Sequence, residues 1–192
     1  MLRTVGILLL LVTGLTYVLW SGRGIPLAGT ANQRVVAEPA WKPPKPDNHR
    51  WRCIVIHHSA THIGGANRFD QAHRRQGWDE LAYHFVIGNG TDTADGEVEV
   101  GGRWTQQKHG AHCKTDDNFY NNHGIGICLV GNFDKTYPTR AQMAALKRLV
   151  RHLCITYDIP PSRIYTHGQV TGMTACPGRN FQLQPVREAA VR

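Results

Sequence analysis

Short apolar runs of strand length, interleaved with segments of helical character, most limit what this chain can fold into. The clearest run, residues 52–58 (RCIVIHH), is rich in β-branched residues, and similar runs follow at 83–87 and 125–130. Runs of this length are typical of buried strands. Residues 139–142 form a capping box that opens an amphipathic helix. The pattern predicts an α/β fold: one mixed β-sheet flanked by α-helices.

Weaker signals complete the predicted domain. Asn67 can cap a helix that runs to about Gln76, residues 97–100 can form a short strand, and residues 163–166 can form a last strand that ends at His167. Alternation within the first strand places Ile54, Ile56 and His58 on one face, with Val55 and His57 on the other.

A proline-rich tract separates this domain from the start of the chain. Residues 21–50 contain five of the ten prolines, which fix φ and remove hydrogen-bond donors. We therefore predict an extended linker over 23–50 and a single domain over 51–192. A chain of 192 residues has room for one compact domain rather than two.

The first 22 residues resemble a signal sequence. Residues 4–22 carry no charge, and nineteen residues of helix span about 28 Å, close to the roughly 30 Å core of a bilayer. An uncleaved signal anchor, a cleaved signal peptide and a buried core helix all remain open. The first two readings predict an exported domain, either tethered by a single-pass membrane helix on the periplasmic or cell-wall side, or secreted.

The charge of the chain is less informative than its distribution. The formal net charge is +8, but residues 1–50 hold six Lys and Arg against two Asp and Glu, so half of the surplus precedes the domain. The rest is dispersed and no recognition motif accompanies it, so we expect no nucleic-acid partner. An anionic cell wall or membrane is the simpler setting.

Histidine and cysteine stand where strands end. His57 ends the first strand, His167 ends the last, and Cys176 follows after eight residues. Two imidazoles and one thiolate are a ligand set for a catalytic zinc that keeps one position for water. The spacing alone leaves the alternative that Cys176 is a small buried apolar residue.

Five segments of the predicted domain form a family signature: 54–61 (IVIHHSAT), 77–85 (GWDELAYHF), 110–112 (GAH), 124–133 (GIGICLVGNF), and His167 with 174–178 (TACPG). In this order they resemble the segments of the zinc amidase family that contains the amidase-type phage lysozymes and the peptidoglycan-recognition proteins. The resemblance covers about 51–181. It implies a zinc-dependent N-acetylmuramoyl-L-alanine amidase that uses activated water to cleave the amide between N-acetylmuramic acid and L-alanine in peptidoglycan.

The resemblance also implies roles for individual residues. His57, His167 and Cys176 match the zinc ligands, and Tyr83 matches the tyrosine that faces the zinc-bound water. Thr174 stands where some phage enzymes have Lys and where active recognition-type amidases have Thr. The loop from His167 to Cys176 is about one residue longer than the family pattern.

Other residues are weaker candidates for substrate contacts. His112 is a candidate substrate-binding residue or a neighbour of the zinc ligands. A solvent-facing loop position is the alternative for it. Arg103, Trp104, Asn122 and His123 are candidates for the rim of the groove, with ordinary surface roles as the alternative.

Two other functions compete with the membrane-tethered or exported amidase, which we expect to be a monomer acting on peptidoglycan or muropeptides. One is a module that binds peptidoglycan without cleaving it, and the other is an exported phage-type lytic enzyme. The intact set of His57, His167 and Cys176 argues against the first. The remaining four cysteines are predicted to be mostly free, buried thiols.

Overall fold

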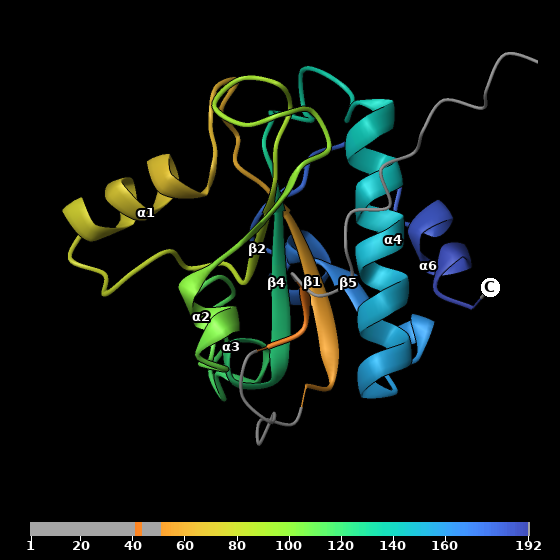
Figure 1. Ribbon diagram of the computed structural model, residues 1–192. Coiled ribbons are helices and arrows are strands. Elements are labelled where there is room, and N and C mark those ends of the chain that lie inside the picture. The colour runs from red at the N-terminus through yellow and green to blue at the C-terminus, as the bar shows by residue number, and fades with distance from the viewer. Residues whose placement is uncertain (1–40, 44–50, 192) are drawn as a thin grey trace, which may run out of the picture. The chain divides into compact units, whose positions relative to one another are not determined.

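The computed structural model describes residues 41–43 and 51–191, which belong to one compact unit. These residues build a five-stranded sheet, with the strands in the order β3-β2-β4-β1-β5 (Figure 1). The strands are β1 (Cys53–His58), β2 (Phe85–Ile87), β3 (Val98–Val100), β4 (Gly124–Leu129) and β5 (Ile164–Thr166). The predicted mixed α/β sheet is therefore confirmed.

Most of the sheet is parallel. β1 pairs in parallel with β4 on one side and with β5 on the other, and β2 pairs in parallel with β4. Only β3 is antiparallel, to β2. Every residue of β1 and β4 is buried, as expected for central parallel strands covered on both faces, and this explains their nearly continuous apolar sequences.

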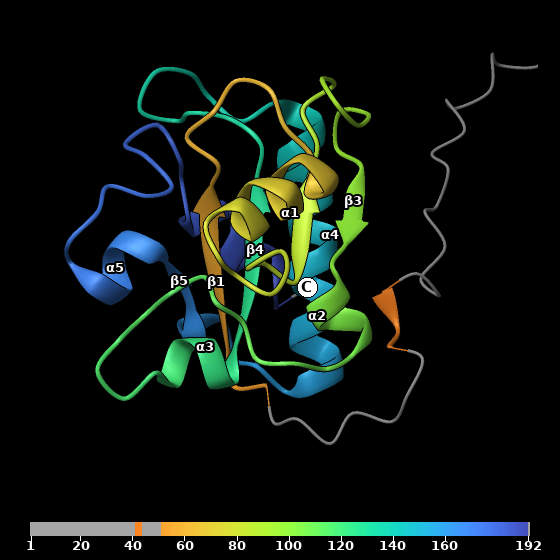
Figure 2. The same cartoon turned by 90° about the vertical axis from the view of Figure 1, so that its left-hand side faces the viewer.

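Helices cover both faces of the sheet. Figure 2 shows α4 behind the sheet and α1 in front of it, and in Figure 1 α6 lies outside α4. The helices are α1 (Ala66–Arg75), α2 (Gly102–Thr105), α3 (Phe119–His123), α4 (Arg140–Tyr157), α5 (His167–Thr171) and α6 (Gln184–Ala189).

The long helix α4 forms as its sequence predicts. Thr139 and Gln142 make the reciprocal capping box, with the Thr139 hydroxyl accepting from the Gln142 backbone N–H. The predicted apolar face is buried at Leu146, Leu149 and Val150 and their neighbours along the helix, whereas Met143 is only partly buried. This face packs on the isoleucines of β1 and β4 and makes the main core.

Because side chains alternate along the central strands, the sheet has a second face, opposite the one that packs on α4. Ile54 and Ile56 of β1 belong to the main core with α4. Cys128 of β4 belongs to a second, smaller apolar cluster against which Tyr83 packs. His57 lies on this second face, so the predicted division of β1 into two faces is confirmed.

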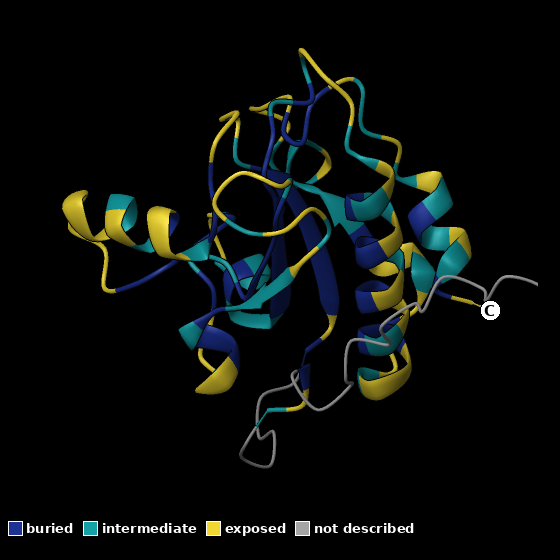
Figure 3. Ribbon diagram, turned by 45° about the horizontal axis from the view of Figure 1, so that its top comes forward, coloured by how far each residue is buried: buried dark blue, intermediate teal, exposed yellow. Residues whose placement is uncertain are grey.

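The start of one helix differs from the sequence prediction. Helix α1 begins at Ala66, with Gly65 rather than Asn67 as its N-cap, because the Glu99 carboxylate accepts from the Ala66 N–H at 2.9 Å. A cap supplied by a distant strand cannot be read from local sequence. In Figure 3 the central strands β1 and β4 are buried, whereas α1 is largely exposed and buries only Phe69.

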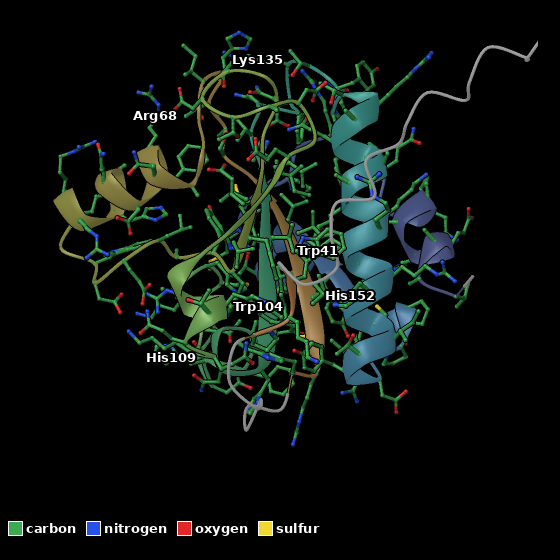
Figure 4. All side chains as sticks on the ribbon, in the orientation of Figure 1. Trp41, Arg68, Trp104, His109, Lys135 and His152 are labelled. Carbon is green, nitrogen blue, oxygen red and sulfur yellow. The ribbon has the colours of Figure 1, made fainter. Side chains whose placement is uncertain are left out.

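Part of the predicted linker packs on the domain. Trp41 is buried: its carbonyl accepts from the indole N–H of Trp104 at 2.8 Å, and its ring meets His152 of α4 edge-on at 5.5 Å (Figure 4). The packed unit therefore includes Trp41, well before the predicted boundary at 51. The predicted membrane span at 1–22 lies outside the described residues, and no helix among those described is long and apolar enough to cross a membrane.

All five cysteines are buried and unpaired. Cys53 and Cys128 lie in the central strands and Cys154 lies on the buried face of α4. The prediction of free, buried thiols for the four cysteines other than Cys176 is confirmed.

Two aliphatic residues of α4 test this account of the core. Leu149 is fully buried, whereas Ile155 is 67% exposed. We expect Leu149→Ala to lower the free energy of unfolding by about 2–5 kcal/mol, through lost burial and a residual cavity. Ile155→Ala should change it by no more than about 0.5 kcal/mol. Urea unfolding followed by circular dichroism measures both, and equal losses would contradict the assignment of the core face.

Candidate active site

Three side chains with metal-binding atoms converge on the second face of the sheet. They are His57 at the end of β1, His167 at the start of α5, and Cys176 in the loop that follows α5. One ligand atom from each lies within 4.8 Å of the others. Nδ1 of His57 is 3.8 Å from the Sγ of Cys176, and the rings of His57 and His167 are 4.7 Å apart.

The local sequence holds these three groups in place. Thr166 and Gln169 form a capping box that starts α5 at His167. The N–H of Gly168 donates to the carbonyl of Cys176 at 2.8 Å, and a Cβ at Gly168 would lie only 2.5 Å from the Thr174 carbonyl. Glycine therefore permits the returning loop to close against the helix.

The donor set suits a zinc ion. A tetrahedral ion with bonds of about 2.0–2.3 Å separates its ligand atoms by roughly 3.5 Å, near the spacing of His57 and Cys176. Burial, followed by the neighbouring imidazoles, holds the pKa of His57 well below its ordinary value, so its ring is neutral and offers a lone pair. Burial raises the pKa of the Cys176 thiol to about 11, and a bound cation would displace that proton.

Tyr83 and Thr174 lie beside the three groups. The Tyr83 ring is 5.2 Å from that of His57, and burial, followed by the thiols of Cys128 and Cys176, raises its pKa well above the ordinary value. The Thr174 hydroxyl accepts from the Cys176 N–H at 3.1 Å, which leaves its own hydrogen available to donate.

His112 contacts the site from the loop between α2 and α3. Its Nδ1 lies 3.0 Å from Nε2 of His57, and its Nε2 lies 3.2 Å from the Gly124 carbonyl oxygen. The His58 ring turns to the other face, where its Nδ1 accepts from the Phe133 N–H at 3.1 Å, but its backbone N–H donates to the Sγ of Cys176 at 3.4 Å.

Two adjoining hollows open over these residues. A smaller one of about 290 Å³ is lined by the three candidate ligands together with Tyr83 and Thr174. A larger one of about 850 Å³ continues from it. The residues that line both are Trp78, Ala111, His112, His167 and Thr174. The two hollows together form what we call the cleft.

Arg103 and Trp104 do not line the cleft, which corrects the prediction for both. The Arg103 guanidinium is buried and donates to the carbonyls of Leu81 at 2.8 Å and His109 at 2.9 Å, and it pairs with Asp79. Trp104 is fully buried in the main core. Both lie in the four-residue helix α2, which packs inward instead of exposing these side chains.

Asn122 and His123 also lie outside the set that lines the cleft, and their neighbour Asn121 belongs to it. Helix α3 is a single turn, too short for a periodic pattern that would distinguish these positions.

Sequence reasoning also missed Trp78, although it stands in a segment already quoted. Its indole is 42% exposed and stacks on His73 at 4.7 Å. The other lining residues missed are His58, Ala60, Asp79, Ala82, Ala111, Lys114, Thr115, Asp116, Asn118, Thr171 and Met173.

Comparison with known proteins agrees with this geometry. The family model described as N-acetylmuramoyl-L-alanine amidase matches residues 47–179. The chain belongs to this family. It is thus a hydrolase, an N-acetylmuramoyl-L-alanine amidase, whose substrate is peptidoglycan, and the predicted family and enzyme class are confirmed.

Individual relatives are similar over most of the amidase domain. The endolysin of Enterobacteria phage K11 is 37% identical over 139 residues, which are 68% of this chain and 82% of the endolysin. The amidase LysC from Clostridium intestinale URNW is 30% identical with a TM-score of 0.64, over 77% of this chain and 90% of LysC. The ectodomain complex of peptidoglycan recognition proteins LCa and LCx, bound to tracheal cytotoxin, is 25% identical with a TM-score of 0.56, over 70% and 80%.

These relatives correct the predicted localisation. The similar proteins include several phage endolysins, and no described helix could span a membrane. A single-pass anchor and an exported domain held by it are therefore unsupported, and the membrane is withdrawn as a partner. The apolar stretch at 4–22 suggested them only through its composition.

Two arginine–carboxylate pairs test the structural role of Arg103. Replacing Arg103 by Met would leave the carbonyls of Leu81 and His109 without their buried donor, so we expect a loss of about 3 kcal/mol in unfolding free energy. Arg68→Met breaks an exposed pair with Asp92 and should leave the stability nearly unchanged. Chemical denaturation compares the two, and a negligible loss for Arg103→Met would contradict the buried role.

Proposed function

We propose that this amidase is zinc-dependent, with His57, His167 and Cys176 as the protein ligands. The observation that carries the proposal is the convergence of two imidazoles and one thiol at the floor of the cleft. Three protein ligands leave a coordination position for water or substrate, as catalytic zinc sites require. The bond cleaved is the amide between N-acetylmuramic acid and L-alanine.

A zinc ion held by these three side chains would supply Lewis acidity for activating water and polarising the amide carbonyl. The chain itself supplies the surrounding groups. Because burial keeps the Tyr83 hydroxyl protonated, it can donate a hydrogen bond to water or to the oxygen on which negative charge develops. Thr174, in the loop after α5 that carries Cys176, is a second candidate donor to the same oxygen.

The larger part of the cleft is the proposed site for the sugar and the stem peptide. It offers an exposed indole at Trp78, an apolar side chain at Met173, and a cation at Lys114 that can face a stem carboxylate. The relatives that bind tracheal cytotoxin support a muropeptide ligand. We further propose that residues 51–192 are the amidase domain and that Trp41 extends it.

A non-catalytic peptidoglycan-binding module remains the second candidate, because recognition proteins are among the relatives. The complete donor set and the neighbouring Tyr83 favour the hydrolase. Similarity to phage endolysins also favours a lytic enzyme.

Removing the thiol tests the metal site. We expect the wild-type chain to hold about one equivalent of zinc and to release stem peptide from purified muropeptides. Cys176→Ala should lose both properties yet still bind muropeptide. Cys154→Ala removes another buried thiol, in the core of α4, and should retain both.

Metal analysis and chromatography of the products measure these outcomes, with and without a chelator. Retention of zinc and turnover by Cys176→Ala would overturn the ligand assignment. A zinc-loaded wild-type chain that binds muropeptide but releases no stem peptide would favour the binding module.

Removing one hydroxyl tests Tyr83. Tyr83→Phe should lower kcat about 10²-fold or more with little change in KM, because the hydrogen bond strengthens mainly in the transition state. Tyr137→Phe makes the same chemical change at a side chain that is 72% exposed and should have no effect. Steady-state kinetics separate the cases, and an unchanged kcat for Tyr83→Phe would remove this residue from the mechanism.

A further inference from the structure

The ring of His112 occupies a slot that two glycines create on the second face of the sheet. A Cβ at Gly126 of β4 would lie 2.3 Å from Cδ2 of His112, and a Cβ at Gly110 would lie 2.4 Å from the same atom. Both distances are far below van der Waals contact. Any side chain larger than hydrogen at these positions would therefore displace the ring.

The loop that carries His112 is fixed by backbone hydrogen bonds on both sides. The Ala111 N–H donates to the Ala82 carbonyl at 3.1 Å, and the Gly110 N–H donates to the Asn121 carbonyl at 2.8 Å. The Cys113 N–H donates to the Asn121 side-chain oxygen at 2.8 Å. The ring is thus held in position from the segment before β2 and from α3.

The hydrogen bonds of the ring have only one consistent direction when it is neutral. The Gly124 carbonyl can only accept, so Nε2 of His112, at 3.2 Å, carries the hydrogen. Nδ1 of the same ring is then an acceptor, and Nε2 of His57, at 3.0 Å, must be the donor. With its hydrogen on Nε2, His57 has a bare Nδ1, the atom that lies 3.8 Å from Cys176 Sγ.

We propose that His112 is a positioning residue for His57: it accepts the hydrogen bond from Nε2 and thereby holds the ring of His57 in the tautomer whose Nδ1 lone pair faces Cys176. The inference rests on the proposed function, because it treats His57 as a metal ligand. Of the two roles that the sequence suggested for His112, it favours the neighbour of the zinc ligands over the substrate contact.

Burial protects the hydrogen bond between His57 and His112 from competition by water. His57 and His112 are 1% and 7% exposed, so water cannot readily replace either partner. A hydrogen bond on the remote nitrogen of a ligating histidine fixes its tautomer and orientation, and loss of such a bond commonly weakens metal binding about 10–100-fold.

Two substitutions of similar shape separate the hydrogen bond from the space that the ring fills. His112→Asn can place an amide oxygen where Nδ1 stands and so keep an acceptor for His57. His112→Leu has the same branching at Cγ as Asn but no acceptor. His62→Leu, at an exposed histidine outside the lining of the cleft, controls for loss of an imidazole.

Zinc affinity of the full chain, measured by competition with a chelator, is the first readout. We expect His112→Leu to bind zinc about 10–100-fold more weakly than wild type, while His112→Asn stays near wild type and His62→Leu is unchanged. Denaturation monitors the fold of each variant. A purely structural residue would lower stability in both His112 variants without separating their zinc affinities, and that outcome would overturn the proposal.

The second readout needs neither zinc nor activity. Nitrogen-15 NMR of the metal-free wild-type chain, labelled at histidine, should show His57 and His112 both protonated at Nε2. A hydrogen on Nδ1 of His57 would overturn the inference even if His112→Leu fails to fold. If wild type binds no zinc but shows the expected tautomers, the zinc proposal fails while the hydrogen-bond arrangement stands.

Discussion

The parallel pairing of β1 with β4 is the interaction on which both the core and the site depend. Its register sets Val55 beside Gly126 and His57 beside Cys128, while Ile54 and Ile56 point to the opposite face and pack towards α4. Because side chains alternate, a slip of one residue would move His57 into the apolar core and an isoleucine into the cleft. The same pairing therefore determines the stability of the domain and the position of its chemistry.

The imidazoles gathered on this face of the sheet are neutral, so they offer lone pairs and carry no charge. Burial lowers the pKa of His57, His112 and His167, so three neighbouring imidazoles can remain neutral close together. A cation is the natural partner for such an arrangement, since it supplies the positive charge that the protein withholds. Arg103, the nearby buried cation, is instead engaged by backbone carbonyls and Asp79, where it ties the segment before Tyr83 to the segment before His112.

Sequence patterns predicted the elements whose burial is periodic. The central strands and α4 could be placed because their alternation and their 3.6-residue period are sustained, and family resemblance selected His57, His167, Cys176 and Tyr83. Helices α2 and α3 are too short to show a period, so the sequence could not predict that Trp104 points inward or that Asn121 lines the cleft. The burial of Trp41 depends on a contact with a residue 63 positions away, which local proline content obscured.

The glycines of β4 have a consequence for how this fold can change. Glycine is a poor strand former, and a β-branched residue would ordinarily strengthen a central strand. The protein cannot gain this stability at Gly126, because the added methyl groups would occupy the space that the imidazole of His112 fills. A substitution of Gly126 that stabilises the sheet would thus displace the His112 ring from the candidate active site. Engineering for thermal stability would meet this trade-off, and so would evolutionary drift.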